Sequence, residues 1–275
     1  MDSLKPTEIV AAMVQSGCAK AELGPFDLLV RGALSGGLLG IATSLAIGAF
    51  AQTGQLLVGA LIFPVGFVMI VILGLELVTG SFALVPLAVM RGQASLGTML
   101  MNWVWVFIGN LIGSVIYAAL LAIVLTDAGQ VAPAGLALKI AAIADAKTLA
   151  YAHFGAAGWL TAFVKAMLCN WMVCLGVVMA LASTSMAGRI LGAWLPIVTF
   201  FAQGYEHSVV NMFVIPAGMM LGAKATLADW WLWNQIPVTL GNIVGGFAFT
   251  GLALYATYGR KPAPASLAAD GAAAD

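Results

Sequence analysis

The stretch QGYEHSVVNMFVIP, residues 203–216, places a carboxylate and an imidazole side by side in one of the most apolar parts of the chain. Ionisable side chains at membrane depth are rare and usually mark a conduction or proton path. The alternative for His207 is a neutral imidazole that hydrogen-bonds to backbone groups freed by a helix break. Glu206 and His207 are neighbours and should point in different directions on any helical turn, so they are not interpreted as a catalytic pair.

Composition places this stretch in a membrane. Of the 275 residues, 62% are hydrophobic and 8% are charged, whereas a soluble domain carries about 25% charged residues. The exterior must therefore face lipid, and we predict an all-α integral membrane protein. The net charge is zero and no basic patch suits nucleic acid. The three cysteines lack metal-ligand spacing and are odd in number, so no metal site, cofactor or disulfide framework is predicted.

Six apolar regions reach the length of about 20 residues that a membrane span needs. They are 28–50, 57–90, 99–125, 158–183, 189–221 and 235–258. The second and fifth are too long for a simple helix, and each is interrupted: the second by LELVTGS (75–81), the fifth by the opening stretch. Irregular backbone at membrane depth is tolerated only where protein buries it or where it lines a watery cavity. We therefore expect both breaks to line a central path.

Short cytoplasmic connections carry an excess of lysine and arginine, which favours both termini in the cytoplasm. In this orientation the cytoplasmic basic residues are Lys5, Lys20, Arg31, Arg91, Arg189, Arg260 and Lys261. The basic residues on the outer side are Lys139, Lys147 and Lys224.

The two halves of the chain also match each other. Glu76 and Glu206 are 130 positions apart, as are Pro86 and Pro216, and GNLIGSVIYAALLAI (109–123) aligns with GNIVGGFAFTGLALY (241–255) at a shift of 132. Each half holds three spans, so the second copy enters the membrane upside down. Inverted repeats with broken helices near the midplane are typical of transporters and channels.

The predicted organisation follows from these spans. It comprises an N-terminal cytoplasmic amphipathic segment (1–27), a first three-span repeat (28–125), an extracytoplasmic connection (126–157), a second, inverted repeat (158–258) and a disordered cytoplasmic tail (259–275). The apolar face of the first segment is expected to lie along the membrane surface.

The repeated polar residues suggest structural roles. Glu76 and Glu206 are expected to anchor the broken backbone by accepting hydrogen bonds from freed amides and from neighbouring subunits. Asn110 and Asn242 are interpreted as symmetric hydrogen-bonding residues between helices. Thr79 either satisfies a nearby carbonyl, as hydroxyls in spans often do, or offers a hydrogen bond to a passing solute opposite His207.

Four of these motifs together resemble the formate/nitrite transporter family. They are LELVTGS, KAMLCNWMVCLGV (165–177), GYEHSVVNMFVIP and TLGNIVGG (239–246), and the likeness covers residues 5–258. The resemblance implies an aquaporin-like fold of six spans in an inverted 3+3 repeat with broken second and fifth helices. It also implies a homopentamer in the bacterial inner membrane, in which each protomer has a pore for formate, nitrite or hydrosulfide.

The family's functional positions carry over by motif. The central histidine matches His207, the loop threonine Thr79, the fourth-span asparagine Asn170 and the vestibule lysine Lys147. Constriction residues of the family match Phe63, Val173 and Phe200 on the outer side and Phe67 and Val78 on the inner side. Two departures are visible: Val78 and Tyr205 each stand where the family often has Phe.

The resemblance predicts a channel that is not an enzyme, with formate as the favoured solute and nitrite or hydrosulfide as alternatives. Lys147 attracts the anion, and His207 protonates it between the two constrictions, which selects weak acids over chloride. A strict proton symporter remains open. An aquaporin-like neutral pore would need paired Asn-Pro-Ala motifs, which the breaks lack. A haem carrier would need a second histidine at membrane depth, and the other histidine, His153, is expected in the polar connection.

Overall fold

The computed structural model describes residues 3–259. The predictions that concern Arg260, Lys261 and the rest of the tail lie outside this part of the chain. Within residues 3–259 all regular secondary structure is helical, apart from one isolated bridge between Ser3 and Ser183. The all-α prediction is therefore confirmed.

Four helical segments are long and apolar enough to cross a membrane. They are α2 (Pro25–Thr53), α6 (Leu96–Leu125), α8 (Ala156–Leu181) and the run Leu227–Tyr258. α2 begins at a proline whose fixed φ suits the first helical turn and ends before Gly54, which has a left-handed φ of 72°. At the start of α6 the Ser95 hydroxyl accepts a hydrogen bond from the Thr98 amide.

The last of these segments contains two π-helical stretches. It consists of α11 (Leu227–Trp230), the π-helix η1 (Trp231–Gln235), α12 (Ile236–Val244), a second π-helix, η2 (Gly245–Leu252), and α13 (Ala253–Tyr258). The first π-helix ends two residues before Pro237, which has no N–H to donate to a regular α-helical ladder.

Four shorter apolar stretches make up the interrupted regions. The first region contains α3 (Leu56–Ile62), α4 (Pro64–Ile72) and α5 (Val78–Met90), and the second contains α9 (Met186–Ala202) and α10 (Ser208–Met220). Both predicted interruptions are present. A further kink between α3 and α4 at Phe63 was not predicted, and it arises because Pro64 lacks the N–H that would continue the helix.

The two main breaks are built in the same way. Gly74 follows the end of α4 by two residues and Gly204 follows the end of α9 by two, and these glycines have left-handed φ values of 62° and 64°. At each, the glycine amide and the next amide bond back to the preceding turn, the hydrogen-bond pattern of a Schellman motif. Residues 71–90 and 201–220 share one secondary-structure string and one pattern of buried and exposed positions. These two segments, which match in sequence, therefore also have the same local structure.

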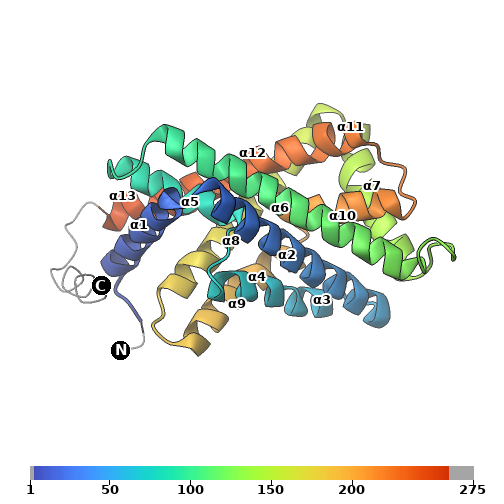
Figure 1. Ribbon diagram of the computed structural model, residues 1–275, viewed down its shortest axis with the longest axis horizontal. Coiled ribbons are helices and arrows are strands. Elements are labelled where there is room, and N and C mark those ends of the chain that lie inside the picture. The colour runs from blue at the N-terminus through green and yellow to red at the C-terminus, as the bar shows by residue number, and fades with distance from the viewer. Residues whose placement is uncertain (1–2, 260–275) are drawn as a thin grey trace.

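Two further helices pack against the helices that follow the breaks. α1 (Pro6–Glu22) packs on α5 at one end of the molecule, and α7 (Leu136–His153) packs on α10 at the other (Figure 1). α13 lies beside α1. The segment 126–157 is thus more than a polar connection, because its 18-residue helix buries apolar side chains against α10.

The apolar face of α1 is covered by protein. Val10, Met13 and Val14 are buried in a cluster with side chains of α5 and α8. The expectation that this face lies on the membrane surface is therefore wrong. Its periodicity was read correctly, but periodicity alone does not say whether protein or lipid covers an apolar face.

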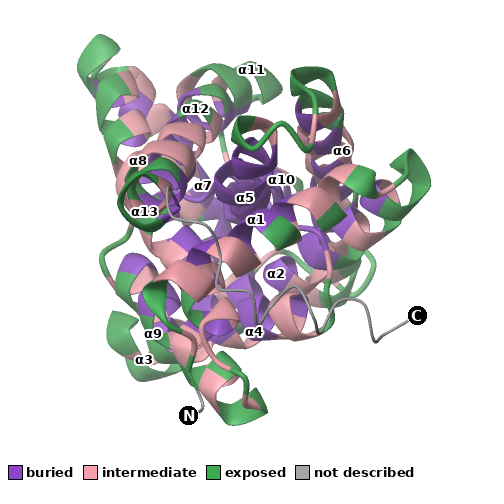
Figure 2. Ribbon diagram, turned by 90° about the vertical axis from the view of Figure 1, so that its left-hand side faces the viewer, coloured by how far each residue is buried: buried purple, intermediate pink, exposed green. Residues whose placement is uncertain are grey.

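Burial is concentrated at the centre of the molecule. Figure 2, seen from the end that carries α1 and α13, shows buried residues around α5 and α10 and exposed residues on the outer helices. Large apolar side chains such as Leu45, Ile116 and Leu120 are exposed on α2 and α6. This surface suits a lipid environment, as the composition predicts.

Candidate functional site

The broken backbone is held by two asparagines that occupy equivalent places. Asn110 on α6 accepts a hydrogen bond from the Val78 amide (3.0 Å) and donates to the carbonyls of Glu76 (2.9 Å) and Gly32 (2.8 Å). Each asparagine bonds to both sides of its break and ties it to a neighbouring helix.

Asn242 on α12 repeats this arrangement at the second break. It accepts from the Ser208 amide (2.9 Å) and donates to the carbonyls of Glu206 (3.1 Å) and Ala166 (2.9 Å). The amides of Val78 and Ser208, at the start of α5 and α10, therefore bond to asparagine side chains. The expectation that Glu76 and Glu206 accept these hydrogen bonds is wrong. Asn110 and Asn242 are 132 positions apart, which is the shift that aligns the two halves of the chain. This spacing indicated that the two asparagines have equivalent roles.

The two glutamates instead form buried ion pairs with lysines. Glu76 pairs with Lys20 of α1 at 2.8 Å, and Glu206 pairs with Lys147 of α7 at 2.7 Å. Both carboxylates are almost fully buried. Lys147 was predicted as an entrance residue. Lys20 was noted only as a cytoplasmic charge, although its distance of 127 positions from Lys147 nearly matches the repeat.

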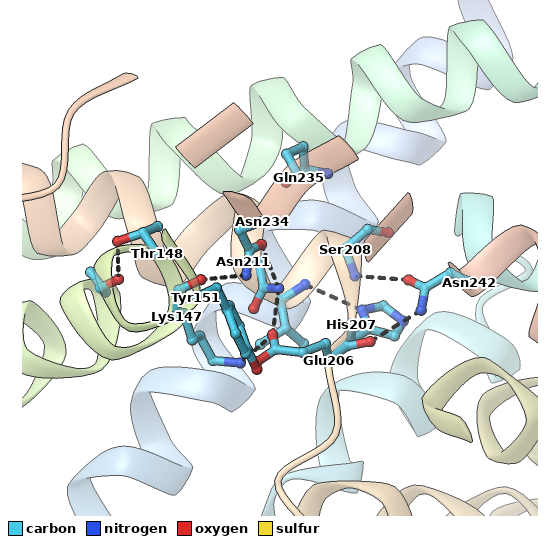
Figure 3. A network of polar contacts seen from close by, with 12 residues as sticks. Lys147, Thr148, Tyr151, Glu206, His207, Ser208, Asn211, Asn234, Gln235 and Asn242 are labelled. Atoms are coloured by element: carbon cyan, nitrogen blue, oxygen red, sulfur yellow. Dashed lines mark hydrogen bonds and ion pairs between the residues drawn. The ribbon is translucent and has the colours of Figure 1, made fainter. Parts of the chain in front are cut away.

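Glu206 has two further donors, as Figure 3 shows. The Tyr151 hydroxyl donates to its Oε1 at 2.8 Å, and Asn211 Nδ2 donates to Oε2 at 2.8 Å. Asn211 also donates to Asn234, which in turn donates to the carbonyl of Lys147. Tyr151 was not predicted from the sequence, because its role depends on how α7 packs against α10.

The two halves differ at the residue that precedes the helix after each break. This residue is Leu77 before α5 and His207 before α10. His207 Nδ1 accepts a hydrogen bond from the Val210 amide (3.2 Å), and Nε2 lies 3.1 Å from the Thr79 hydroxyl. Because Nδ1 is an acceptor in this arrangement, the proton of the neutral ring resides on Nε2 and is directed at Thr79. Thr79 therefore lies opposite His207, and its hydroxyl contacts the imidazole directly.

Asn170 of α8 supports the Thr79 side of this contact. Its Nδ2 donates to the carbonyls of Thr79 (3.0 Å) and Asn242 (2.6 Å), and the Cys174 thiol also lies within hydrogen-bonding distance of the Thr79 carbonyl (3.3 Å). The side-chain oxygen of Asn170, Oδ1, is buried and has no hydrogen-bond partner among residues 3–259. Asn170 therefore joins both breaks.

The five predicted constriction residues are all buried in the central apolar cluster: Phe63, Phe67, Val78, Val173 and Phe200. The rings of Phe63 and Phe200 meet edge to face, with centroids 5.7 Å apart. Phe200 also stacks near the His207 imidazole at 5.8 Å. This pair of phenylalanines therefore lies on one side of the histidine.

Phe67 faces a cavity of about 320 Å³ on the α1 side of the molecule. Lys20, Glu76, Gly80, Arg31 and Arg189 also line this cavity. It reaches Gly80 on α5, the residue that follows Thr79.

The remaining residues noted in the sequence lie away from the central contact. Within residues 3–259 no group of three or more His, Cys, Asp or Glu side chains could hold a metal ion. His153 is exposed at the end of α7. The Tyr205 hydroxyl donates to Gln203 at 2.8 Å at the exposed edge of the second break.

Comparison with known proteins places these features in a family. A family model described as formate/nitrite transporter matches residues 7–256. The chain belongs to the formate/nitrite transporter family. Its members are channels and transporters, so this protein is a membrane transport protein and not an enzyme.

Several relatives match along nearly their full length. A probable formate transporter of Methanothermobacter thermautotrophicus is 37% identical, over 94% of this chain and 96% of that one. The formate channel FocA of Escherichia coli K12 is 29% identical over the same shares.

Two solved structures are also similar. One, an FNT family ion channel, has a TM-score of 0.80 at 28% identity and covers 93% of this chain and all of its own. The other, a pentameric formate channel with formate bound, has a TM-score of 0.68 at 29% identity and covers 86% and 98%.

Proposed function

We propose that this protein is a pore for small weak-acid anions, most of all formate, and that His207 protonates the solute in transit. The contact between Thr79 and His207 carries the proposal. It lies where the two broken helices meet, with apolar side chains around it and a cavity that reaches the residue next to Thr79. The names of similar proteins, a probable formate transporter and a channel with formate bound, support formate. Nitrite is the second candidate, because the family takes its name from both solutes.

The energetic argument concerns the apolar constrictions. A bare anion loses its hydration there, at a cost of several kcal/mol. The neutral acid avoids most of this cost. Formate and nitrite can take up a proton, whereas chloride remains an anion. The two apolar constrictions therefore select solutes that His207 can neutralise. They are formed by Phe63, Val173 and Phe200 on one side and by Phe67 and Val78 on the other.

The geometry of His207 sets a condition on this step. The neutral ring cannot release its only N–H proton readily, so the donor is the doubly protonated imidazolium. An imidazolium carries a proton on Nδ1, where the Val210 amide now donates. Charging the ring therefore requires this contact to open. The imidazolium then transfers the Nε2 proton to a solute oxygen, and the neutral ring later regains a proton from water.

The other site residues support this passage. Lys147 attracts the anion at the entrance on the α7 side, and Asn170 holds the Thr79 segment. Asn110 and Asn242 hold the breaks, and Glu76 and Glu206 pair with Lys20 of α1 and Lys147 of α7. No cofactor takes part in this scheme.

We also propose six membrane crossings in an inverted 3+3 repeat, divided at 28–125 and 158–258, with both termini cytoplasmic in a bacterial inner membrane. The equivalent breaks support the repeat, and the position of α13 beside α1 supports termini on one side. The similarity to a pentameric channel supports a homopentamer. Mass measurement of the detergent-purified protein tests the pentamer.

Uptake into proteoliposomes tests the function. We expect formate to pass faster than chloride and its flux to rise on acidification, with nitrite and hydrosulfide compared in parallel. His207→Asn is the sharpest variant, because asparagine can still accept the Val210 amide at the start of α10 but cannot carry a proton. Loss of acid-stimulated formate uptake with normal folding supports the scheme. Unchanged uptake in this variant would show that His207 does not protonate the solute.

A further inference from the structure

The two lysine–glutamate pairs occupy equivalent places but differ in geometry. Lys20 contacts both oxygens of Glu76, at 2.8 and 2.9 Å. Lys147 contacts only Oε2 of Glu206, at 2.7 Å. The repeat thus supplies an internal comparison, in which one ammonium is held by two oxygens and the other by one.

Tyr151 accounts for this difference. Its hydroxyl occupies Oε1 of Glu206, the oxygen that a second contact from Lys147 would need. The shift of 127 positions between Lys20 and Lys147 relates Tyr151 to Gly24, which has no side chain. Nothing comparable to the phenol can therefore come from that position in the first half.

The tyrosine is fixed in place by its surroundings. Its side chain is buried on α7, and the ammonium of Lys165 on α8 lies 5.8 Å from the ring centroid, within the range of a cation–π contact. Figure 3 shows the ring beside the Lys147 side chain, with both reaching the same carboxylate. One phenol hydroxyl and one ammonium therefore divide the two oxygens of Glu206 between them.

We infer that Tyr151 is a positioning residue for anion capture. It satisfies one oxygen of Glu206 and so keeps Lys147 in a contact with a single oxygen, in which the ammonium retains donors for an arriving anion. This inference rests on the proposed function only in the role it gives Lys147 toward anions. The geometric part, that Tyr151 controls how tightly Glu206 holds Lys147, can be measured without any solute.

Removal of the hydroxyl should change the ion pair. In Tyr151→Phe, Oε1 of Glu206 becomes a buried carboxylate oxygen without that donor, which is unfavourable. The nearest flexible donor is the Lys147 ammonium, which already touches Oε2. We expect it to contact both oxygens, as Lys20 does with Glu76, and to become less available to anions.

The first test measures the reactivity of lysines in the purified full-length protein. Reductive methylation followed by peptide mass spectrometry gives a rate for each lysine. In Tyr151→Phe we expect methylation of Lys147 to slow by at least about threefold, while Lys20 keeps its wild-type rate. Tyr117→Phe is the matched control, because it removes a tyrosine hydroxyl that bonds to Ser44, away from the glutamates.

The second test measures transport by the same variants. Formate and nitrite uptake by Tyr151→Phe should show a half-saturating concentration about threefold higher or more, with an unchanged maximal rate. In a Lys147→Met background the same substitution should change neither value further. A purely structural role would lower the maximal rate or the folded yield and leave the half-saturating concentration unchanged.

The outcomes separate the two proposals. If Lys147 reacts at its wild-type rate in Tyr151→Phe, or slows equally in Tyr117→Phe, the positioning role is refuted even where formate uptake is normal. If Lys147 slows as expected but the wild-type protein carries neither formate nor nitrite, the proposed function fails and the positioning role stands. Should Tyr151→Phe not fold, Tyr151→Met removes both ring and hydroxyl, and the same slowing of Lys147 is expected.

Discussion

Replacement of Asn242 by leucine tests whether the second break depends on one side chain. Leucine keeps most of the volume but removes three hydrogen bonds, from the Ser208 amide and to the carbonyls of Glu206 and Ala166. A net value of about 1 kcal/mol for each gives a destabilisation of about 3 kcal/mol. Because all three groups are buried, water cannot readily replace the lost partner.

Thermal unfolding in detergent, followed by tryptophan fluorescence, measures this loss. For a chain of this size, a change of about 3 kcal/mol corresponds to a fall in Tm of roughly 6–10 °C. Asn110→Leu removes the equivalent three bonds at the first break and should give a similar fall. Gln203→Leu is the control, since this amide is exposed at the edge of the second break, and its effect should stay within about 0.5 kcal/mol.

Two results would refute the reasoning. If Asn242→Leu unfolds at the same temperature as Gln203→Leu, the asparagine does not hold the break. If Asn242→Leu and Asn110→Leu differ severalfold in their effect on Tm, the two breaks are not energetically equivalent. Equivalent hydrogen bonds would then not imply equal contributions to stability.

Three further predictions concern the pore, the helix packing and the orientation. Thr79→Val removes the hydroxyl that contacts the central imidazole and keeps the side-chain shape, so formate uptake relative to chloride uptake should fall while Tm stays within a few degrees. Gly113→Ala places a methyl group against the backbone of α2 and should cost about 1–3 kcal/mol. In Gly37→Ala the new methyl group would lie 3.8 Å from the Gly113 carbonyl oxygen, so this variant should unfold like the wild type. Cys169 and Cys174 are fully buried, so a membrane-impermeant maleimide should label Cys18 alone, and only from the cytoplasmic side. Burial raises the pKa of the Cys18 thiol, so this labelling should be faster at alkaline pH. Labelling from the outside would reverse the proposed orientation.

The breaks were predictable because their causes are local in the chain. Glycine followed two residues later by glutamate recurs at 74–76 and 204–206, a shift of 130, and the α6 and α12 asparagines recur at a shift of 132. Such patterns report helix ends and buried polar groups without any knowledge of packing. The same patterns suggested a path at His207 and a solute contact at Thr79, whereas the family resemblance added Asn170, Lys147 and the constriction residues.

The ion pairs were not predictable for the opposite reason. Lys20 and Glu76 are far apart in the sequence and meet only because α1 packs on α5. The same packing turned the apolar face of α1 toward protein. Tyr151 has no repeat partner, so its bond to Glu206 left no signal. Long-range contacts of this kind depend on tertiary packing, which residue periodicity does not encode.

Comparison of the two halves also shows which features of the breaks are shared and which residue differs between them. Both breaks share a left-handed glycine, an asparagine brace and a lysine–glutamate pair. They differ at the residue before the next helix, where Leu77 stands in one half and His207 in the other. α5 begins without a side-chain cap, so a helix at this place does not require one. Capping alone therefore does not explain an imidazole before α10. The property that His207 has and Leu77 lacks is a proton that can be exchanged, and its Nε2 faces the one hydroxyl that the first break supplies at this point.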